Sequence, residues 1–281
     1  MNRWHTDYHS PHRGLAFEVT ETLHQESSPY QTIEIVQTPA FGRVMLLDGV
    51  LMLTQDDEFV YHEMLAHPAL FAHPHPRRVL IVGGGDCGTL SRVLQHPEVE
   101  QAVQVELDEM VTRVSRTYFP ALTAAADDPR ARLVFADGIE YLRNCAEPFD
   151  VILIDSTDPV GPAEGLFRAP FFADCRRALN RDGILCLQSE SPWIPDLRDV
   201  IAEVNRDLRA LFPIVRAYSA AIQTYQAGLW LFQIASLSYD PLDPETGERV
   251  AALALDTRYY DRETHYGAFA LPKFARVLVK G

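Results

Sequence analysis

Short apolar runs separated by turn sequences dominate the first part of the chain. The segments Tyr30–Val36 and Arg43–Leu47 are rich in β-branched and long apolar residues, and turn-forming residues separate such segments throughout residues 15–53. Strand-forming runs interrupted by turn residues at short intervals are typical of antiparallel sheets. The pattern predicts a small β-stranded domain without a helix, which we assign to residues 1–55.

One helix is expected after these strands. It runs from about Asp57 to Ala66, and Thr54 or Asp56 is placed to cap its first turn. The segment His73–Arg77 contains two prolines and is interpreted as a stiff linker.

Continuous apolar runs alternate with helical stripes from residue 78 onwards. Val79–Val82 and Val151–Ile154 have the composition of strands buried on both faces, whereas Leu197–Leu211 carries apolar residues at helical spacing. Strands that alternate with helices in this way form a mostly parallel sheet with helices on both faces. We therefore expect an α/β domain over residues 56–281.

Composition excludes several classes of protein. Hydrophobic residues make up 47% of the 281 and charged residues 23%, which is typical of a globular chain. The formal net charge of −14 disfavours binding to nucleic-acid phosphates and suits a cationic small substrate. No apolar run reaches the roughly 20 residues of a membrane span, and the four cysteines lack zinc-ligand spacing. We expect a cytoplasmic protein with free thiols and with neither nucleic acid nor membrane as a partner.

A glycine-rich loop follows the first strand of the expected α/β domain. Ligands of such sheets bind beyond the carboxyl ends of the strands, where glycines let a ligand approach the backbone. The loop Gly83–Gly88 fits this position, although a tight turn alone would also explain it. Asp86 lies among the glycines, and its carboxylate repels phosphate and favours a cation.

Acidic residues follow the next two strands. Glu106 comes about 20 residues after the glycines, the spacing at which an acid binds ribose hydroxyls; the alternative is a solvated acid at a strand end. Asp137 could cap a helix or accept from an exocyclic adenine amine, and the sequence favours neither. Asp108 is interpreted as a helix cap.

Asp155 and Asp158 follow the buried strand Val151–Ile154. An amine of pKa ~10 is protonated at neutral pH and must lose a proton before it can attack. A desolvated carboxylate can take that proton, so we favour amine capture over metal binding, since no His or Cys neighbours the pair in sequence. The loop Thr157–Gly165 is long enough to act as a lid. A nucleoside slot beside this acidic pocket fits an adenosyl sulfonium donor and an amine acceptor.

At these residues the chain resembles the polyamine aminopropyltransferases, especially the bacterial spermidine synthases. The resemblance covers nearly the whole chain and rests on the motifs FGRVMLLDGV, DEFVYHEM, VLIVGGGDCG, DSTDPVGPAEGLF, AIQTYQAGLW and YYDRETHYGAFALPKF. It implies a small N-terminal antiparallel β domain followed along the chain by a Rossmann-like catalytic domain of the S-adenosylmethionine-dependent methyltransferase type. It also implies a homodimer or homotetramer, no metal and no permanently bound cofactor.

The resemblance implies transfer of an aminopropyl group from the co-substrate decarboxylated S-adenosylmethionine to putrescine, which gives spermidine and 5′-methylthioadenosine. Another acceptor, such as cadaverine, agmatine or spermidine, is the alternative within the family. An S-adenosylmethionine-dependent methyltransferase and a non-catalytic polyamine or nucleoside sensor are the remaining hypotheses. Asp86 favours the decarboxylated donor, because its charge repels a donor that still carries a carboxylate.

The resemblance also assigns roles to individual residues. Asp155 would accept the proton, Asp155 and Asp158 would hold the attacking amine, and Asp86 would bind an ammonium group. The other polyamine-site residues would be Tyr61, His62, Gln188 and Tyr225. The methylthioadenosine part would contact Gln31, Gly83, Gly85, Glu106, Asp137, Gly138 and Pro162. Without the resemblance, His62 could be an ordinary helix histidine, Tyr225 a core aromatic residue and Gln31 a solvent-facing side chain.

The chain departs from the family pattern at positions near these residues. The family sequence GGGDGG followed by Leu-Arg-Glu has Cys87 in the loop here, and the helix after it contains Ser91 and Arg92. Gln223 and Gln226 stand where the family has prolines. The differences at Gln223 and Gln226 bear on the identity of the acceptor amine.

Overall fold

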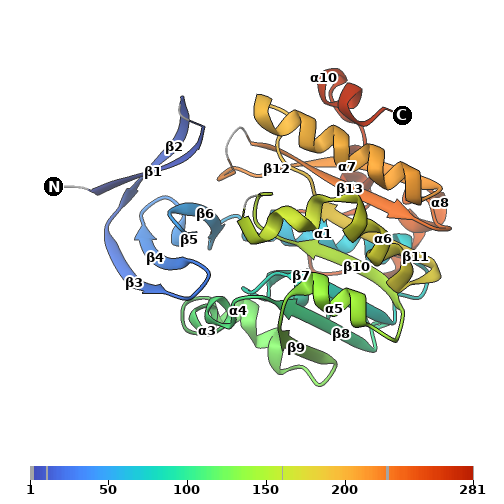
Figure 1. The fold of residues 1–281 in the computed structure, drawn as a ribbon, viewed down its shortest axis with the longest axis horizontal. Coiled ribbons are helices and arrows are strands. Elements are labelled where there is room, and N and C mark those ends of the chain that lie inside the picture. The colour runs from blue at the N-terminus through green and yellow to red at the C-terminus, as the bar shows by residue number, and fades with distance from the viewer. Residues whose placement is uncertain (1–2, 11, 160, 226–227, 281) are drawn as a thin grey trace.

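The computed structural model describes residues 3–10, 12–159, 161–225 and 228–280, and its N-terminal part contains two antiparallel sheets (Figure 1, blue). One sheet pairs β1 (Arg3–Ser10) with β2 (Arg13–Val19). The other contains, in spatial order, β3 (Glu21–Ser27), β4 (Thr32–Thr38), β5 (Gly42–Leu47) and β6 (Val50–Thr54). The expected small antiparallel β unit is confirmed.

The turn between β5 and β6 shows how local sequence sets this sheet. Asp48 and Gly49 both adopt positive φ, at 51° and 82°, which is the geometry that tight hairpins favour at an Asp-Gly pair. Ile33 and Ile35 of β4 alternate with more exposed residues and are fully buried against Val111 of the α/β part. The small sheet therefore packs on the larger part through one apolar face.

The larger part is built on a seven-stranded sheet in the order β12-β13-β11-β10-β7-β8-β9. Its strands are β7 (Arg78–Gly83), β8 (Gln101–Glu106), β9 (Ala131–Phe135), β10 (Phe149–Asp155), β11 (Leu179–Gln188), β12 (Ile214–Ala221) and β13 (Leu229–Ser236). The five strands from β11 to β9 run parallel, whereas β13 is antiparallel to both of its neighbours. The expected mostly parallel sheet is confirmed.

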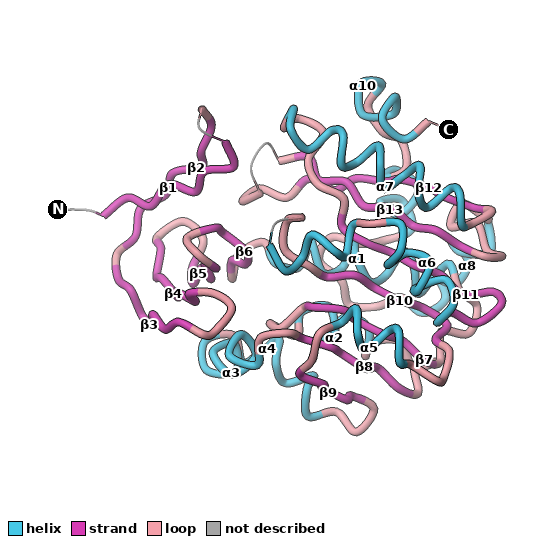
Figure 2. The backbone as a smooth tube through the Cα atoms, in the orientation of Figure 1, coloured by secondary structure: helices cyan, strands magenta, loops and turns pink. Residues whose placement is uncertain are grey.

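Helices cover both faces of this sheet (Figures 1 and 2). They are α1 (Glu58–Ala72), α2 (Gly88–Val93), α3 (Glu109–Tyr118), α4 (Pro120–Thr123), α5 (Gly138–Asn144), α6 (Ala169–Ala178), α7 (Arg198–Leu211), α8 (Pro244–Leu253), α9 (Arg262–Ala268) and α10 (Lys273–Arg276). Short 3₁₀ turns are η1 (Ala124–Asp127), η2 (Gly161–Phe167), η3 (Pro195–Leu197) and η4 (Val277–Val279). Within the described ranges, none of the helices has both the length and the apolar character that a membrane crossing requires.

Alternate residues of the central strand β7 separate the two layers of the core. Val79 and Ile81 belong to the apolar cluster that contains α1, α2 and α8, whereas Leu80 and Val82 belong to the cluster formed with α5, α6 and α7. Successive strand side chains point to opposite faces of a sheet. The continuous apolar run in the sequence therefore reflects burial on both faces.

Helix α1 differs from its expected extent. It ends at Ala72 rather than Ala66, and its N-cap residue is Asp57, while Thr54 donates to the Asp57 carboxylate at 2.6 Å. The helix continues through Pro68, and every residue from Val60 to Ala72 is buried. A helix buried on all sides shows no amphipathic stripe, so the pattern of apolar residues does not mark its end.

Candidate functional site

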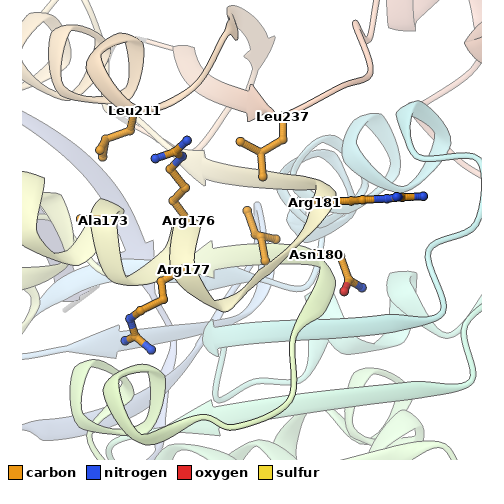
Figure 3. A pocket seen from close by; sticks show the side chains of 8 residues that line it. Ala173, Arg176, Arg177, Asn180, Arg181, Leu211 and Leu237 are labelled. Carbon is orange, nitrogen blue, oxygen red and sulfur yellow. The ribbon is translucent and has the colours of Figure 1, made fainter.

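A cavity of about 540 Å³ opens at the carboxyl ends of β7, β8 and β10, and Gln31 before β4 and Met52 on β6 complete its wall. Ligands of open α/β sheets bind at this edge. A second cavity, of about 360 Å³, is lined by Arg176, Arg177 and Arg181 beside α6 and β11, with no carboxylate among its described lining residues (Figure 3). The acidic residues singled out in the sequence lie in the first cavity, which we take as the site.

The glycine-rich loop packs directly on the end of β10. Gly83 and Gly84 have positive φ of 87° and 68°, and the Gly84 amide donates to the Asp155 carbonyl oxygen at 2.8 Å. A Cβ on Gly83 would overlap that carbonyl oxygen, and one on Gly84 would lie 2.6 Å from Asp155 Oδ2. These glycines are therefore required for the close approach of Asp155 as well as for the backbone conformation.

Hydroxyl groups from two helices hold the Asp155 carboxylate. Tyr61 donates to Oδ1 at 2.9 Å, and Thr89 donates to Oδ2 at 2.6 Å. Burial and the nearby charge of Asp86 raise the pKa of Asp155, while these two hydrogen bonds and the charge of His62 oppose that rise. The result is a fixed carboxylate whose affinity for a proton is higher than that of an ordinary aspartate.

Asp86, in the glycine-rich loop, is held by contacts with α2 and α1. Its Oδ1 accepts from the Gly88 amide at 2.6 Å and lies 3.4 Å from His62 Nε2, while His62 Nδ1 lies 2.7 Å from Glu58 Oε2. Burial alone would lower the pKa of His62, but Asp86 and Glu58 raise it to about 10. Burial opposes ionisation of Asp86, yet the charge of His62 lowers the pKa of Asp86 below its usual value.

Asp86 and Asp155 are thus two neighbouring carboxylates whose pKa values are shifted in opposite directions, downwards for Asp86 and upwards for Asp155. Asp86 favours the charged form that binds a cation, whereas Asp155 favours taking up a proton. Environments that push the pKa values of two acids apart are the usual way in which binding and proton transfer are divided between them.

Glu106 lies at the end of β8 beside the glycine loop. Its Oε1 accepts from the Asp108 amide at 2.8 Å, and a Cβ on Gly85 would lie 3.0 Å from its Oε2. Burial raises the pKa of Glu106 to about 7, and a partner that donates hydrogen bonds would stabilise its charged form. It is not the solvated strand-end acid that the sequence left as an alternative.

The loop between β3 and β4 is bonded to this part of the cavity wall by Asp108, which lies after β8. As expected, Asp108 caps α3, because its Oδ1 accepts from the Met110 amide at 3.0 Å. Its Oδ2 also accepts from Ser28 at 2.7 Å and from Gln31 Nε2 at 3.0 Å. Gln31 is therefore half-buried at the cavity wall rather than directed to solvent.

Asp137 caps α5 and also lines the cavity. Its Oδ1 accepts from the amides of Ile139 and Glu140 at 2.7 and 3.3 Å, so the capping interpretation is correct. A Cβ on Gly138 would lie 2.5 Å from Val82, which explains why glycine starts this helix against β7. The side chain of Asp137 remains exposed, so capping leaves it open to a ligand.

Aromatic residues form the wall beside the carboxylates. The rings of Tyr61 and Tyr225 lie 5.7 Å apart, and Tyr225 donates to the Met52 carbonyl oxygen at 3.1 Å. Asp158 lines the same cavity. Tyr225 also packs on Trp230 at 4.7 Å, so its core-packing and site-lining interpretations both hold.

Gln188 is placed differently from its expected role. It is buried outside the cavity lining, where its Oε1 accepts from the Glu190 amide at 3.1 Å and its Nε2 donates to the Ser156 carbonyl oxygen at 3.4 Å. Glu190 has a positive φ of 60°, and this turn brings its amide back onto the Gln188 side chain. The side chain of Pro162 lies outside what the structure describes, as do all features of Gln226.

Sequence reasoning missed several residues that support the site. Thr89 holds Asp155, while Glu58 and Arg92 form an ion pair at 3.0 Å beneath His62. Asp57 accepts from the Thr224 amide at 2.9 Å and from its hydroxyl at 2.7 Å, next to Tyr225. Of these residues, only Glu58 could have been identified from the local sequence, because it stands one helical turn before His62 and can therefore contact it.

Comparisons with known proteins agree along the whole chain. Residues 58–242 match the family model described as spermine/spermidine synthase domain, and residues 3–55 match that described as spermidine synthase tetramerisation domain. A polyamine aminopropyltransferase from Bacillus mycoides (strain KBAB4) is 43% identical over 280 residues and covers 100% of both chains. One from Bacillus subtilis (strain 168) is 42% identical over 99% of both chains.

Solved structures show the same similarity. A crystal structure of spermidine synthase in complex with the transition state analogue AdoDATO is 39% identical, with a TM-score of 0.94 over 99% of this chain and 96% of that one. The spermidine synthase from Thermotoga maritima is 37% identical, with a TM-score of 0.92 over 99% of this chain and 95% of that one.

Proposed function

The chain belongs to the spermine/spermidine synthase family of transferases, and we propose that it transfers the aminopropyl group of decarboxylated S-adenosylmethionine to putrescine. The products would be spermidine and 5′-methylthioadenosine. The observation that carries the proposal is the pair Asp86 and Asp155, two half-buried carboxylates with opposed proton affinities at the edge of a cavity that also contains Glu106.

The donor side of the site suits an adenosyl sulfonium. Glu106 is placed to accept hydrogen bonds from ribose hydroxyls, and Asp137 and Gln31 line the adjoining part of the cavity. Asp86 would pair with the ammonium group of the aminopropyl arm. A donor that still carried its carboxylate would meet the charge of Asp86, which disfavours S-adenosylmethionine itself.

The reaction is a displacement at the carbon next to sulfur. The amine nitrogen gives its proton to Asp155 and forms a bond to the aminopropyl carbon, while the bond from that carbon to sulfur breaks. The electron pair of the broken bond stays on sulfur, so the leaving group is a neutral thioether and needs no acid. The protein therefore contributes orientation and deprotonation, with Tyr61 and Thr89 fixing the base.

Product analysis tests this proposal. Purified protein is incubated with decarboxylated S-adenosylmethionine and putrescine, and spermidine and 5′-methylthioadenosine are quantified by chromatography. We expect both products in equal amounts, and none with S-adenosylmethionine as the donor. If neither putrescine nor any of cadaverine, agmatine and spermidine yields 5′-methylthioadenosine, the proposal is wrong; a preference for one of the others would reassign the acceptor.

The oligomeric state is part of the same proposal. Trp4 and Tyr8 on the β1–β2 hairpin are 62% and 67% exposed, within the segment that matches the tetramerisation model. Large exposed aromatic residues are typical of interfaces between subunits. We expect a homotetramer or homodimer, and light scattering on the wild type and on Trp4→Ser measures it.

A further inference from the structure

Four charged residues of alternating sign form a continuous chain beside the cavity. Arg92 Nη2 lies 3.0 and 3.1 Å from the two oxygens of Glu58, Glu58 lies 2.7 Å from His62, and His62 lies 3.4 Å from Asp86. Glu58 and His62 are on α1, whereas Asp86 precedes α2 and Arg92 lies in the last turn of α2. The chain therefore spans the contact between these two helices and ends at the carboxylate that we assign to the ammonium group.

Arg92 is the member of this chain that is farthest from the cavity. The side chains of Arg92 and Glu58 are each only 12% exposed, and Arg92 Nε is buried without a hydrogen-bond partner among the described residues. A surface ion pair contributes little, but a pair shielded from water interacts strongly and is costly to break. The burial of Arg92 is thus compensated mainly by Glu58, since its other hydrogen bond within the described residues is a weaker one to Ser91 at 3.4 Å.

We propose that Arg92 is a positioning residue of the site for the donor's ammonium group. It acts through Glu58 and His62 to keep Asp86 as the charged carboxylate that binds this group. This inference rests on the proposed aminopropyl transfer and adds to it the residue that sets the charge of the site. Arg92 does not line the cavity, so it acts on Asp86 by its charge, both directly and through the chain, and not by touching a ligand.

The physical argument is one of charge balance. The imidazolium of His62 lies between two carboxylates, and its attraction is divided between them. Arg92 neutralises Glu58, which leaves the charge of His62 available to Asp86. Loss of the guanidinium would leave Glu58, Asp86 and Asp155 with one cation instead of two, and like charges raise one another's proton affinity.

The groups that face His62 come from every element around it. Glu58 and Tyr61 are on its own helix, Asp86 is on the loop after β7, and the charge of His62 also acts on Asp155 at the end of β10. The ring packs on Gly88, where any Cβ would overlap it. His62 is therefore confined between its two acids and cannot turn away when the charge of Glu58 changes.

The test compares the pH dependence of kcat/KM in variants of Arg92. The acid limb of this profile is the fall of kcat/KM at low pH. Arg92→Gln should move this limb to higher pH by at least about 0.5 unit, which corresponds to a threefold gain in the proton affinity of Asp86. Arg92→Lys, which keeps the charge, should return the limb towards the wild-type position. Arg113→Gln is the matched control, since it removes the same charge from an exposed ion pair with Glu26 and should leave the profile unchanged.

A second variant and a measurement without substrate make the test independent. Glu58→Gln frees His62 for Asp86, so the limb should move to lower pH, the opposite direction; this variant decides if Arg92→Gln does not fold. Carboxyl NMR of Asp86 in ligand-free protein should follow the same directions. Unchanged Asp86 titration in folded Arg92→Gln, or a shift to higher pH in Glu58→Gln, would overturn the inference. Absence of aminopropyl transfer by the wild type would instead refute the proposed function and leave the Asp86 titration informative.

Discussion

The hydroxyl of Thr89 donates to Asp155 Oδ2 over 2.6 Å, although the two residues come from helix α2 and strand β10. Thr89 is fully buried, so water does not compete for this bond. A hydrogen bond to the charged form of a carboxylate favours that form and fixes its orientation. Thr89 thus limits how far burial raises the proton affinity of Asp155 and, together with Tyr61, fixes the orientation of the carboxylate.

Thr89→Val should slow turnover while preserving the fold. The substitution keeps the shape of the side chain and removes the donor, so we expect kcat to fall about tenfold, equivalent to one lost hydrogen bond of ~1.4 kcal/mol. Because the pKa of Asp155 would rise further, the acid limb of the rate profile should move to higher pH. Thr89→Ser keeps the donor and is the control. Equal kinetics for Val and Ser would show that the bond has no role.

Asp155→Asn removes the group to which we assign proton acceptance. We expect a fall in kcat of at least roughly 10²-fold, in line with the loss of a positioned base. Steady-state assays with saturating amine measure it, and thermal unfolding checks that the variant folds. Near-normal turnover in a folded variant would assign the base to another residue.

Asp86→Asn tests the charge that we assign to ammonium binding. Binding of the decarboxylated donor should weaken at least about tenfold, whereas 5′-methylthioadenosine, which carries no ammonium group, should bind almost as before. Isothermal titration calorimetry with both ligands separates the two effects. If both ligands weaken equally, Asp86 supports the loop rather than the cation.

The contact between Asp57 and Thr224 should control the position of Tyr225. Thr224→Val removes two hydroxyl contacts of 2.7 and 2.8 Å to the buried Asp57 carboxylate, so we expect about 1–3 kcal/mol of destabilisation. Displacement of the adjacent Tyr225 should raise KM for the amine more than KM for the donor. Thr224→Ser is the matched control, and kinetics together with urea unfolding provide both readouts. An unchanged amine KM in a destabilised variant would limit the contact to folding.

A buried histidine pair should make the protein less stable in mild acid. His67 Nδ1 and His96 Nε2 lie 2.9 Å apart, and burial lowers the pKa of His96 to about 3 and that of His67 well below its usual value. The unfolded chain therefore binds more protons below pH ~6.5, so stability is complete above that pH and falls as the pH is lowered towards the folded values, by up to about 1.4 kcal/mol per unit for each proton.

Unfolding by urea at pH 7.5 and 5.5 measures this loss. His96→Asn cannot titrate in this range and should show a smaller difference between the two pH values than the wild type. His75→Ala is the control, since the side chain of His75 is 68% exposed. The same pH dependence in the wild type and in His96→Asn would place the effect elsewhere.

Much of the fold follows from local sequence. Short apolar runs such as Val79–Val82, which alternate with helical segments, favour strands between two layers of helices, because both faces of the run have to be shielded from water. The Asp-Gly pair at residues 48 and 49 determines its own hairpin. The extent of α1 was not predictable in this way, since its sides are buried by elements that are remote in the sequence.

In the site, too, the positions of some residues follow from the sequence and those of others do not. Glu106 and Asp155 end strands, and Asp86 and Asp137 follow strand ends closely; because parallel strands end at one edge of a sheet, topology brings these acids to one cavity. Gln188 also ends a strand, yet its side chain does not line the cavity, because it bonds to the Glu190 amide and to the Ser156 carbonyl oxygen instead. Position at a strand end predicts proximity but not the direction of a side chain.

The sequence by itself determined the sheet, the acidic edge and the family, because periodicity, strand ends and ordered motifs are properties of neighbouring residues. Only the tertiary structure decided which acid takes up a proton and which stays charged. That choice depends on burial, on the charge of Asp86, which raises the pKa of Asp155 from 69 positions away, and on the charge of His62, which lowers the pKa of Asp86 from 24 positions away. Burial and opposite charge act through space, so they exist only once the chain has folded.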